Sequence, residues 1–301
     1  MSESGGLLVK MIEDICGEDL FNSIITVLLK NPFTDFGESI STMIKTIYDI
    51  AMSVAVMLMF VYFLLALVDK MTSENFSWDQ VWRQMALLLA AKMLMEHGYD
   101  LLKLMSDVGI ELISMITAGI SDITGLGIEY NAAGEIVGFK VNVWGGDATA
   151  KSLLDNYHVE FGFGILSGIY NLLSDALLFV QLILPWLFSW IMRIAMKIIC
   201  YTRLIEIYVR AAFAPIALSD FFKNGFQGGG WRYLKSFLAV CLQGALILCI
   251  AVMFATLCQE LLDPTETSLF TFIGYYFAFG CSALMLMFKS LGLTKDIMGV
   301  N

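Results

Sequence analysis

The chain has 301 residues, of which 58% are hydrophobic and 15% are charged, and its formal net charge is −10. A typical soluble domain is about 25% charged. This composition excludes an ordinary soluble globule and predicts an all-α polytopic membrane protein with about five transmembrane helices. It also makes free nucleic acid a poor general ligand.

The first 46 residues form an acidic N-terminal region. Apolar residues recur at helical spacing between Leu7 and Leu29, which predicts one or two amphipathic helices at the membrane surface or against a partner. The region lacks a cationic start followed by an apolar core, so we expect no cleaved signal peptide. Residues 47–121 then hold the first two predicted membrane helices, beginning with the apolar stretch Ile50–Val68.

A charged stripe lies on the second of these, Gln84–Ser121. If the segment is a single helix, six charged side chains at steps of three or four residues fall within an arc of about 100° on one face. These residues are Lys92, Glu96, Asp100, Lys103, Asp107 and Glu111. Six such side chains facing lipid would cost on the order of 15 kcal/mol, which is comparable to the stability of a whole protein. The charged stripe is therefore not expected to face acyl chains.

Three interpretations of the charged stripe remain open. The helix lies partly outside the bilayer with this face solvated, or the face packs against another helix or subunit that supplies cations, or it lines an aqueous passage through an oligomer. Two lysines and four acids leave a net charge of −2, which pairing within the helix cannot neutralise. The same helix decides the topology, because one crossing by 84–121 gives five spans and none gives four.

The segment 122–160 is glycine-rich and polar, and it is predicted to be an extracytoplasmic loop. Alternate positions at Val137, Phe139, Val141 and Val143 are apolar, and turn-forming residues precede them at Asn131–Gly134. This pattern predicts a small β-hairpin in the loop.

Three further membrane helices are predicted in the last segment, 161–301, at Ala176–Ile191, Ser236–Cys258 and Ser268–Phe288. Pro185 lies in the middle of the first and should kink it. Between the first and the second, residues 192–235 hold seven bases and two acids, a net charge of +5. The positive-inside rule places this basic segment and the C-terminus in the cytoplasm. With five spans the N-terminus is outside, so the predicted topology is N-out and C-in.

No pattern in the chain indicates catalysis, a cofactor or a metal site. The phosphate-binding, zinc-protease and serine-nucleophile motifs do not occur, and the two histidines, His97 and His158, stand alone. The six cysteines form no C-x-x-C pair and are interpreted as small hydrophobic residues. We therefore predict that the protein is not an enzyme.

The run from Arg203 to Ile247 has an ordered pattern: an arginine, small residues, a proline, a glycine-containing turn, and an aromatic–Leu–Lys start to a helix that contains a glutamine. The positions are Arg210, Ala211, Ala212, Pro215, Asp220, Gly225, Gly230, Tyr233, Leu234, Lys235 and Gln243. In this run the chain resembles the TrbL-like polytopic membrane subunits of type IV secretion and conjugal transfer systems. The remainder is similar in architecture only.

The resemblance implies a non-enzymatic channel or platform component of the cytoplasmic membrane, without a cofactor, that helps translocate a DNA–protein substrate. It implies a homo-oligomeric ring that contacts pilin or stalk subunits and motor ATPases, for which the seven bases would offer a docking face. The acidic stripe favours contact between subunits over contact with DNA. A secondary transporter and a non-conducting structural scaffold are the alternatives, although no visible repeat supports the transporter.

Overall fold

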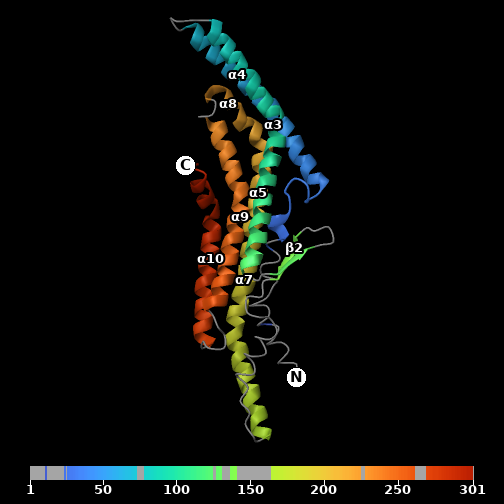
Figure 1. Cartoon of the computed structure of the whole chain (residues 1–301), viewed down its shortest axis with the longest axis vertical. Helices are drawn as coiled ribbons and strands as arrows, with labels where there is room; N and C mark the ends of the chain where they lie inside the picture. Colours follow the sequence, from blue (N-terminus) through green and yellow to red (C-terminus); the bar gives the residue numbers. More distant parts are fainter. Residues whose placement is uncertain are drawn as a thin grey trace. The chain divides into compact units, whose positions relative to one another are not determined.

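A computed structural model describes Met11, Ile24 and residues 26–72, 78–124, 127–130, 136–140, 164–224, 228–261 and 269–300 (Figure 1). The chain divides into two compact units. The first unit comprises Met1–Leu29, Ser114–Cys200 and Leu246–Lys289, and the second comprises Lys30–Ile113, Tyr201–Ala245 and Ser290–Asn301. Apart from two short strands, every element that the described residues form is a helix.

Four long helices carry the apolar stretches of the sequence. They are α3 (Glu38–Met71), α7 (Gly164–Ser219), α9 (Gly229–Leu261) and α10 (Leu269–Ile297). Within the described residues, each is long and apolar enough to cross a membrane. The chain is therefore a multi-pass membrane protein, as its composition predicts. The apolar window of α9 is 67% buried, against 17–33% in the other three, so α9 is the helix most enclosed by its neighbours.

Helix α7 contains parts of two segments that were predicted separately. The predicted span Ala176–Ile191 and most of the basic segment that follows belong to one helix of 56 residues. Pro185 cannot donate the backbone hydrogen bond to residue 181, yet the helix continues past it to Ser219. The basic segment is thus helical from residue 192 to Ser219, a stretch that contains no glycine, and its glycines lie beyond the end of the helix.

The predicted continuous helix over the charged stripe is wrong at one point. The structure forms α4 (Trp78–Glu96) and α5 (Gly98–Thr124), with a turn at His97 between them. The Tyr48 hydroxyl donates a hydrogen bond of 2.6 Å to the Met95 carbonyl at this turn. A Cβ atom at Gly98 would lie 2.5 Å from the Tyr48 hydroxyl, so the glycine is what lets α3 approach the junction. Neither α4 nor α5 is among the four long apolar helices, and the fifth crossing stays a prediction.

The hydrophobic core of the second unit draws on α3, α4, α5, α7 and α9. Its largest buried side chains include Ile44, Met95, Leu102 and Phe237. The short helix α8 (Phe221–Asn224) packs against both α3 and α4, and its Phe222 ring lies 6.1 Å from the Phe63 ring of α3. Helices α3 and α4 themselves lie side by side (Figure 1).

The first unit contains the two strands and an aromatic cluster. Strands β1 (Gly127–Tyr130) and β2 (Ile136–Lys140) pair antiparallel, with a register irregularity between Glu129 and Tyr130. The turn of the predicted hairpin, Asn131–Gly134, lies outside the described residues, as do most residues of the predicted N-terminal amphipathic helices. The Phe188 ring of α7 packs edge-on against Tyr276 of α10, with 5.9 Å between centroids.

Candidate functional site

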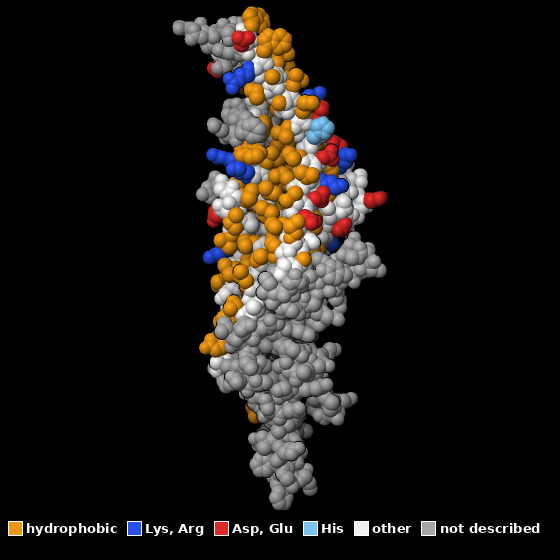
Figure 2. All heavy atoms as spheres, viewed as in Figure 1, with side chains coloured by type: hydrophobic (Ala, Val, Ile, Leu, Met, Phe, Trp, Pro, Cys, Tyr) orange, Lys and Arg blue, Asp and Glu red, His pale blue; other side chains and the backbone are white. Residues whose placement is uncertain are grey.

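The charged stripe is turned away from the core of the second unit. Lys92 and Glu96 end α4, and the other four members lie on α5; Lys103 is half-buried and the remaining five are exposed. The residues that α5 buries include Leu102, Ser106, Gly109 and Ile113, which alternate with the stripe at helical spacing. Figure 2 shows blue and red side chains gathered along one border of the view, beside an orange apolar face. Among the described residues, only a few, such as Asn31 beside Asp107, touch the stripe.

Few contacts neutralise the stripe. The Lys92 Nζ lies 3.5 Å from the Glu96 Oε1, with both side chains about half exposed, and such pairs contribute only about 0.3–0.5 kcal/mol. The Asp107 Oδ1 accepts a hydrogen bond of 2.7 Å from the Asn31 side-chain amide. Among the described residues, Lys103 forms no ion pair. The predicted surplus of negative charge therefore remains on the surface.

The turn at His97 changes the geometry that the sequence predicts for the stripe. Because α4 and α5 are separate helices, its first two members need not continue the row formed by the other four. The Tyr99 ring packs edge-on against both Phe33 and Tyr48, with centroids 5.7 Å and 5.5 Å apart.

An exposed apolar row accompanies the charged row on α5. Its members are Leu104, Val108, Leu112 and Met115. They recur every three or four residues, as the charges do, and each of the first three directly follows a charged residue of the stripe. A helix surface that is both charged and apolar suits neither water nor acyl chains alone. This surface is suited to contact with another protein chain.

The family-like segment forms the contact between α7 and α9 in the second unit. Arg203 is 7% exposed, and its guanidinium donates to the carbonyls of Val240 at 3.1 Å and Cys241 at 2.9 Å. A Cβ atom at Gly244 would lie 2.6 Å from the Arg203 Cζ, so the glycine leaves the space that the guanidinium fills. The sequence pattern does not single out this arginine. The signal for it is Gly244, which lies one turn beyond the two acceptor residues and leaves space for a large side chain.

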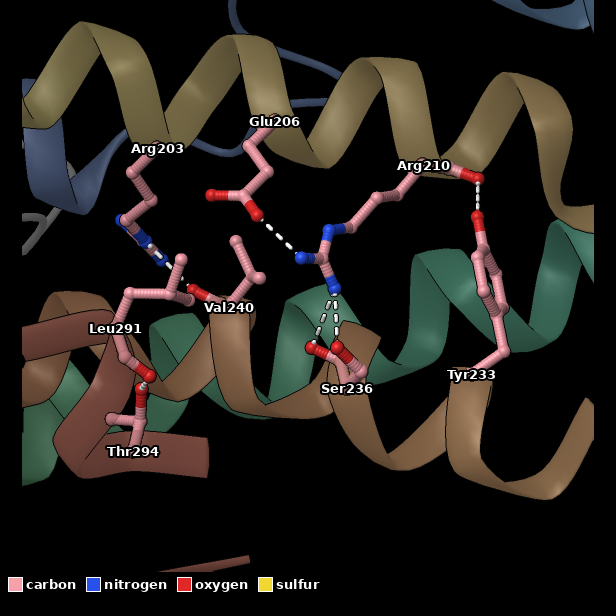
Figure 3. Close-up of polar contacts among 8 residues, drawn as sticks. All are labelled: Arg203, Glu206, Arg210, Tyr233, Ser236, Val240, Leu291 and Thr294. Atoms are coloured by element: carbon pink, nitrogen blue, oxygen red, sulfur yellow. Dashed lines mark hydrogen bonds and ion pairs between the residues drawn. The ribbon is translucent and has the colours of Figure 1, made fainter. Parts of the chain in front are cut away.

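Arg210 makes a second set of contacts about two helical turns further along α7 (Figure 3). Its guanidinium lies 2.5 Å from the Glu206 carboxylate, and it donates to the Ser236 hydroxyl at 2.6 Å and to the Ser236 carbonyl at 3.1 Å. The Tyr233 hydroxyl donates to the Arg210 backbone carbonyl. Glu206 and Arg210 are four residues apart on α7, and both side chains are at most one-quarter exposed.

The other family-like positions lie at the turn between α7 and α9 or on these two helices. The Asp220 carboxylate accepts a hydrogen bond of 2.6 Å from the Gly229 amide at the start of α9, which satisfies one of the free donors there. A Cβ atom at Gly230 would lie 3.1 Å from the Ala217 carbonyl oxygen. Pro215 is buried in α7, and the Lys235 Nζ lies 6.0 Å from the Trp231 ring centroid. Gln243 donates 2.9 Å to the Ser290 hydroxyl of α10.

These contacts correct the predicted docking face of seven bases. Arg203 is buried and Arg210 is only 19% exposed, so neither is available to a soluble partner. Both arginines turn inward because the α9 backbone carbonyls and the Glu206 carboxylate are their hydrogen-bond acceptors. Lys197 and Arg232 are exposed, while the Lys223 side chain lies outside the described residues.

Comparison with known proteins identifies no family. No family model matches the chain, and no curated protein or solved structure matches it. The resemblance of Arg203–Ile247 to the conjugal transfer subunits is therefore carried by its own residues alone.

Proposed function

We propose that this chain is a platform or channel subunit of a conjugative type IV secretion machine in a cytoplasmic membrane, where it helps translocate a DNA–protein substrate. In this role it forms a homo-oligomeric ring and contacts pilin or stalk subunits and motor ATPases. It has five spans with the N-terminus outside and the C-terminus inside, and it performs no catalysis itself. The ordered family-like positions, several of which lie at the contact of α7 with α9, support this assignment.

One observation carries the proposal: the charged stripe and the apolar row of α5 are both exposed in the single chain. A surface with a net charge of −2 and apolar side chains among its charges gains from a protein neighbour that supplies cations and covers the apolar groups. An oligomer provides such a neighbour in every copy. A self-contained transporter would have no need to present this surface.

The test is a charge reversal at the half-buried member of the stripe. Lys103→Glu changes the net charge of the stripe from −2 to −4 and places a carboxylate where a cation lies, so we expect loss of the oligomer and at least a tenfold loss of DNA transfer at a normal protein level. Lys103→Arg is the matched control and keeps both near wild type. Oligomer mass is measured in detergent and transfer by mating frequency.

Normal assembly and normal transfer by Lys103→Glu would refute the role of the stripe. Photocrosslinking from position 107 tests the channel role separately. Crosslinks to DNA in transit support passage past this surface, whereas crosslinks to protein alone assign the chain to the platform.

A further inference from the structure

We propose that the charged stripe on α5 of one chain packs against the C-terminal part of α10 of the next chain in the ring. In this contact Asp107 faces Lys295, and Lys103 faces Asp296. The inference rests on the proposed homo-oligomeric ring and names the surface that covers the stripe there. All four residues belong to the second unit.

Helices α5 and α10 lie on opposite sides of α9. A Cβ atom at Gly109 of α5 would lie 2.8 Å from the Cys241 carbonyl oxygen and 3.2 Å from the Cys241 Cβ atom. Two residues further along α9, the Gln243 side chain donates a hydrogen bond to the Ser290 hydroxyl of α10. Residues two apart on a helix point about 200° away from each other. Surfaces on opposite sides of one chain allow copies to join head to tail, as a ring requires.

On both helices the proposed surface points away from α9. Around α5, Asp107 and Lys103 point about 160° and about 120° away from the residue that contacts α9. Around α10, Lys295 and Asp296 point about 140° and about 120° away from the residue that contacts α9. The two aspartates are exposed and the two lysines are half-buried. All four side chains are therefore directed toward a neighbouring chain rather than toward their own core.

Helix α5 runs parallel to α9, and α10 runs antiparallel to it. Helices α5 and α9 both begin beside the end of α7, where a Cβ atom at Gly98 would lie 3.0 Å from the Leu218 Cδ1 and one at Gly230 would lie 3.1 Å from the Ala217 carbonyl oxygen. Helix α10 follows α9 after a short connection, and the hydrogen bond that joins them lies at a similar distance from that connection on both helices. Heights along α9 can therefore be counted from these contacts at about 1.5 Å per residue.

The facing residues lie at matching heights. Counted from the two contacts on α9, Asp107 and Lys295 are level with residues 239 and 238, and Lys103 and Asp296 with residues 235 and 237. The members of the two pairs therefore differ in height by about 1.5 Å and about 3 Å. Copies in a membrane ring are related by rotation about the membrane normal, which leaves height unchanged. Only groups at one level can meet across such a contact, and these pairs satisfy that condition.

The charges of the two surfaces are complementary. Helix α10 holds two lysines and one aspartate, a net charge of +1, against −2 on the stripe. Among the described residues, neither Lys295 nor Asp296 forms an ion pair. The Asp107 Oδ1 accepts the Asn31 hydrogen bond, and the second carboxylate oxygen can still accept from a lysine. Three of the four residues are level with the uncharged stretch Ser236–Cys258 of α9, where an unpaired charge is costly.

Exchange of the charges at positions 107 and 295 tests the contact in the full chain. Asp107→Lys places two lysines opposite each other, and Lys295→Asp places two acids opposite each other. We expect each variant to raise the dissociation constant between subunits in detergent by at least about tenfold. The chain with both changes restores an opposite pair and should assemble as the wild type does. The matched control combines Asp107→Lys with Lys45→Asp, an exposed position on α3. It restores the net charge without restoring the pair, so it should stay dissociated.

Co-expression separates a failure to assemble from a failure to fold. The Asp107→Lys chain and the Lys295→Asp chain carry different tags. Each α5 then meets a complementary α10 of the other variant, so we expect the two chains to copurify although neither associates with itself.

Wild-type association of either single variant would overturn the contact of α5 with α10 and leave the ring of the proposed function intact. A loss of assembly that neither the double variant nor co-expression restores would also overturn the contact, because the two residues would then act independently. A wild-type chain that is monomeric in the same detergent would refute the ring and the contact together.

Discussion

At the scale of single residues, Arg203 fits beside α9 only because residue 244 is a glycine. Arg203 has no room beside α9 unless position 244 lacks a side chain, and its two hydrogen bonds go to backbone carbonyls that no substitution at 240 or 241 can remove. A buried guanidinium is costly unless its donors are satisfied. The identity of residue 244 therefore affects how α7 and α9 pack against each other.

Substituting Gly244 tests this coupling. Gly244→Ala would push a methyl group to within 2.6 Å of the Arg203 Cζ, and we expect the free energy of unfolding to fall by about 1–3 kcal/mol. Thermal unfolding of the purified chain in detergent micelles measures the change.

The matched control is Gly292→Ala in α10, where an added Cβ atom would meet no atom within 4 Å. Alanine favours a helix over glycine by up to about 1 kcal/mol, so this variant should unfold at the same temperature or slightly higher. Equal stability of the two variants would show that Arg203 has another way to fit.

At the scale of elements, α5 and α9 approach each other through a backbone contact. A Cβ atom at Gly109 would lie 2.8 Å from the Cys241 carbonyl oxygen, the same atom that accepts the Arg203 hydrogen bond. Three helices of the second unit thus converge on one carbonyl group. A backbone atom cannot move aside as the end of a flexible side chain can, so α5 must separate from α9 if residue 109 grows.

We therefore expect Gly109→Ala to destabilise the chain by about 3 kcal/mol, at the upper end of overpacking effects. Gly119→Ala, on the same helix, adds a Cβ atom that meets nothing within 4 Å and should leave stability unchanged or raise it slightly. Both are compared by the yield of folded chain after heating in detergent. A tolerated alanine at 109 would argue against the close α5–α9 contact.

The elements also show what a sequence can and cannot predict. The apolar stretches of α3, α7, α9 and α10 are visible as runs of lipid-compatible residues, because membrane helices are selected by composition over about 20 positions. The turn at His97 is not visible, because it depends on Tyr48, which lies 49 positions earlier in the chain. For the same reason the inward direction of Arg203 and Arg210 cannot be predicted from charge counts, which detect a basic segment but not which atoms accept its hydrogen bonds.

At the scale of the whole molecule, the charge distribution governs association. The chain carries a net charge of −10, Arg203 and Arg210 are occupied by contacts within the second unit, and the stripe presents acids with few partners. Copies of the chain can associate through the stripe only if each acidic side chain finds a cation, which makes the contact electrostatic. Such contacts weaken as the Debye length falls from about 10 Å at 0.1 M salt to about 3 Å at 1 M.

This gives a prediction for the assembled protein. The oligomer mass in detergent should fall between 0.1 M and 1 M salt by the steps expected for loss of whole subunits, as measured by light scattering. A chain with Lys103→Arg should show the same salt dependence. An oligomer that persists unchanged at 1 M salt would show that apolar contacts alone hold the subunits together.

The space that Gly244 leaves for the Arg203 guanidinium also has an evolutionary consequence. A related chain that replaced Arg203 with a shorter apolar residue would lose the group that fills this space, and alanine or serine at 244 would then restore the packing. Positions 203 and 244 should therefore vary together among descendants of this sequence, although 41 residues separate them, and this covariation would locate the α7–α9 contact without any coordinates.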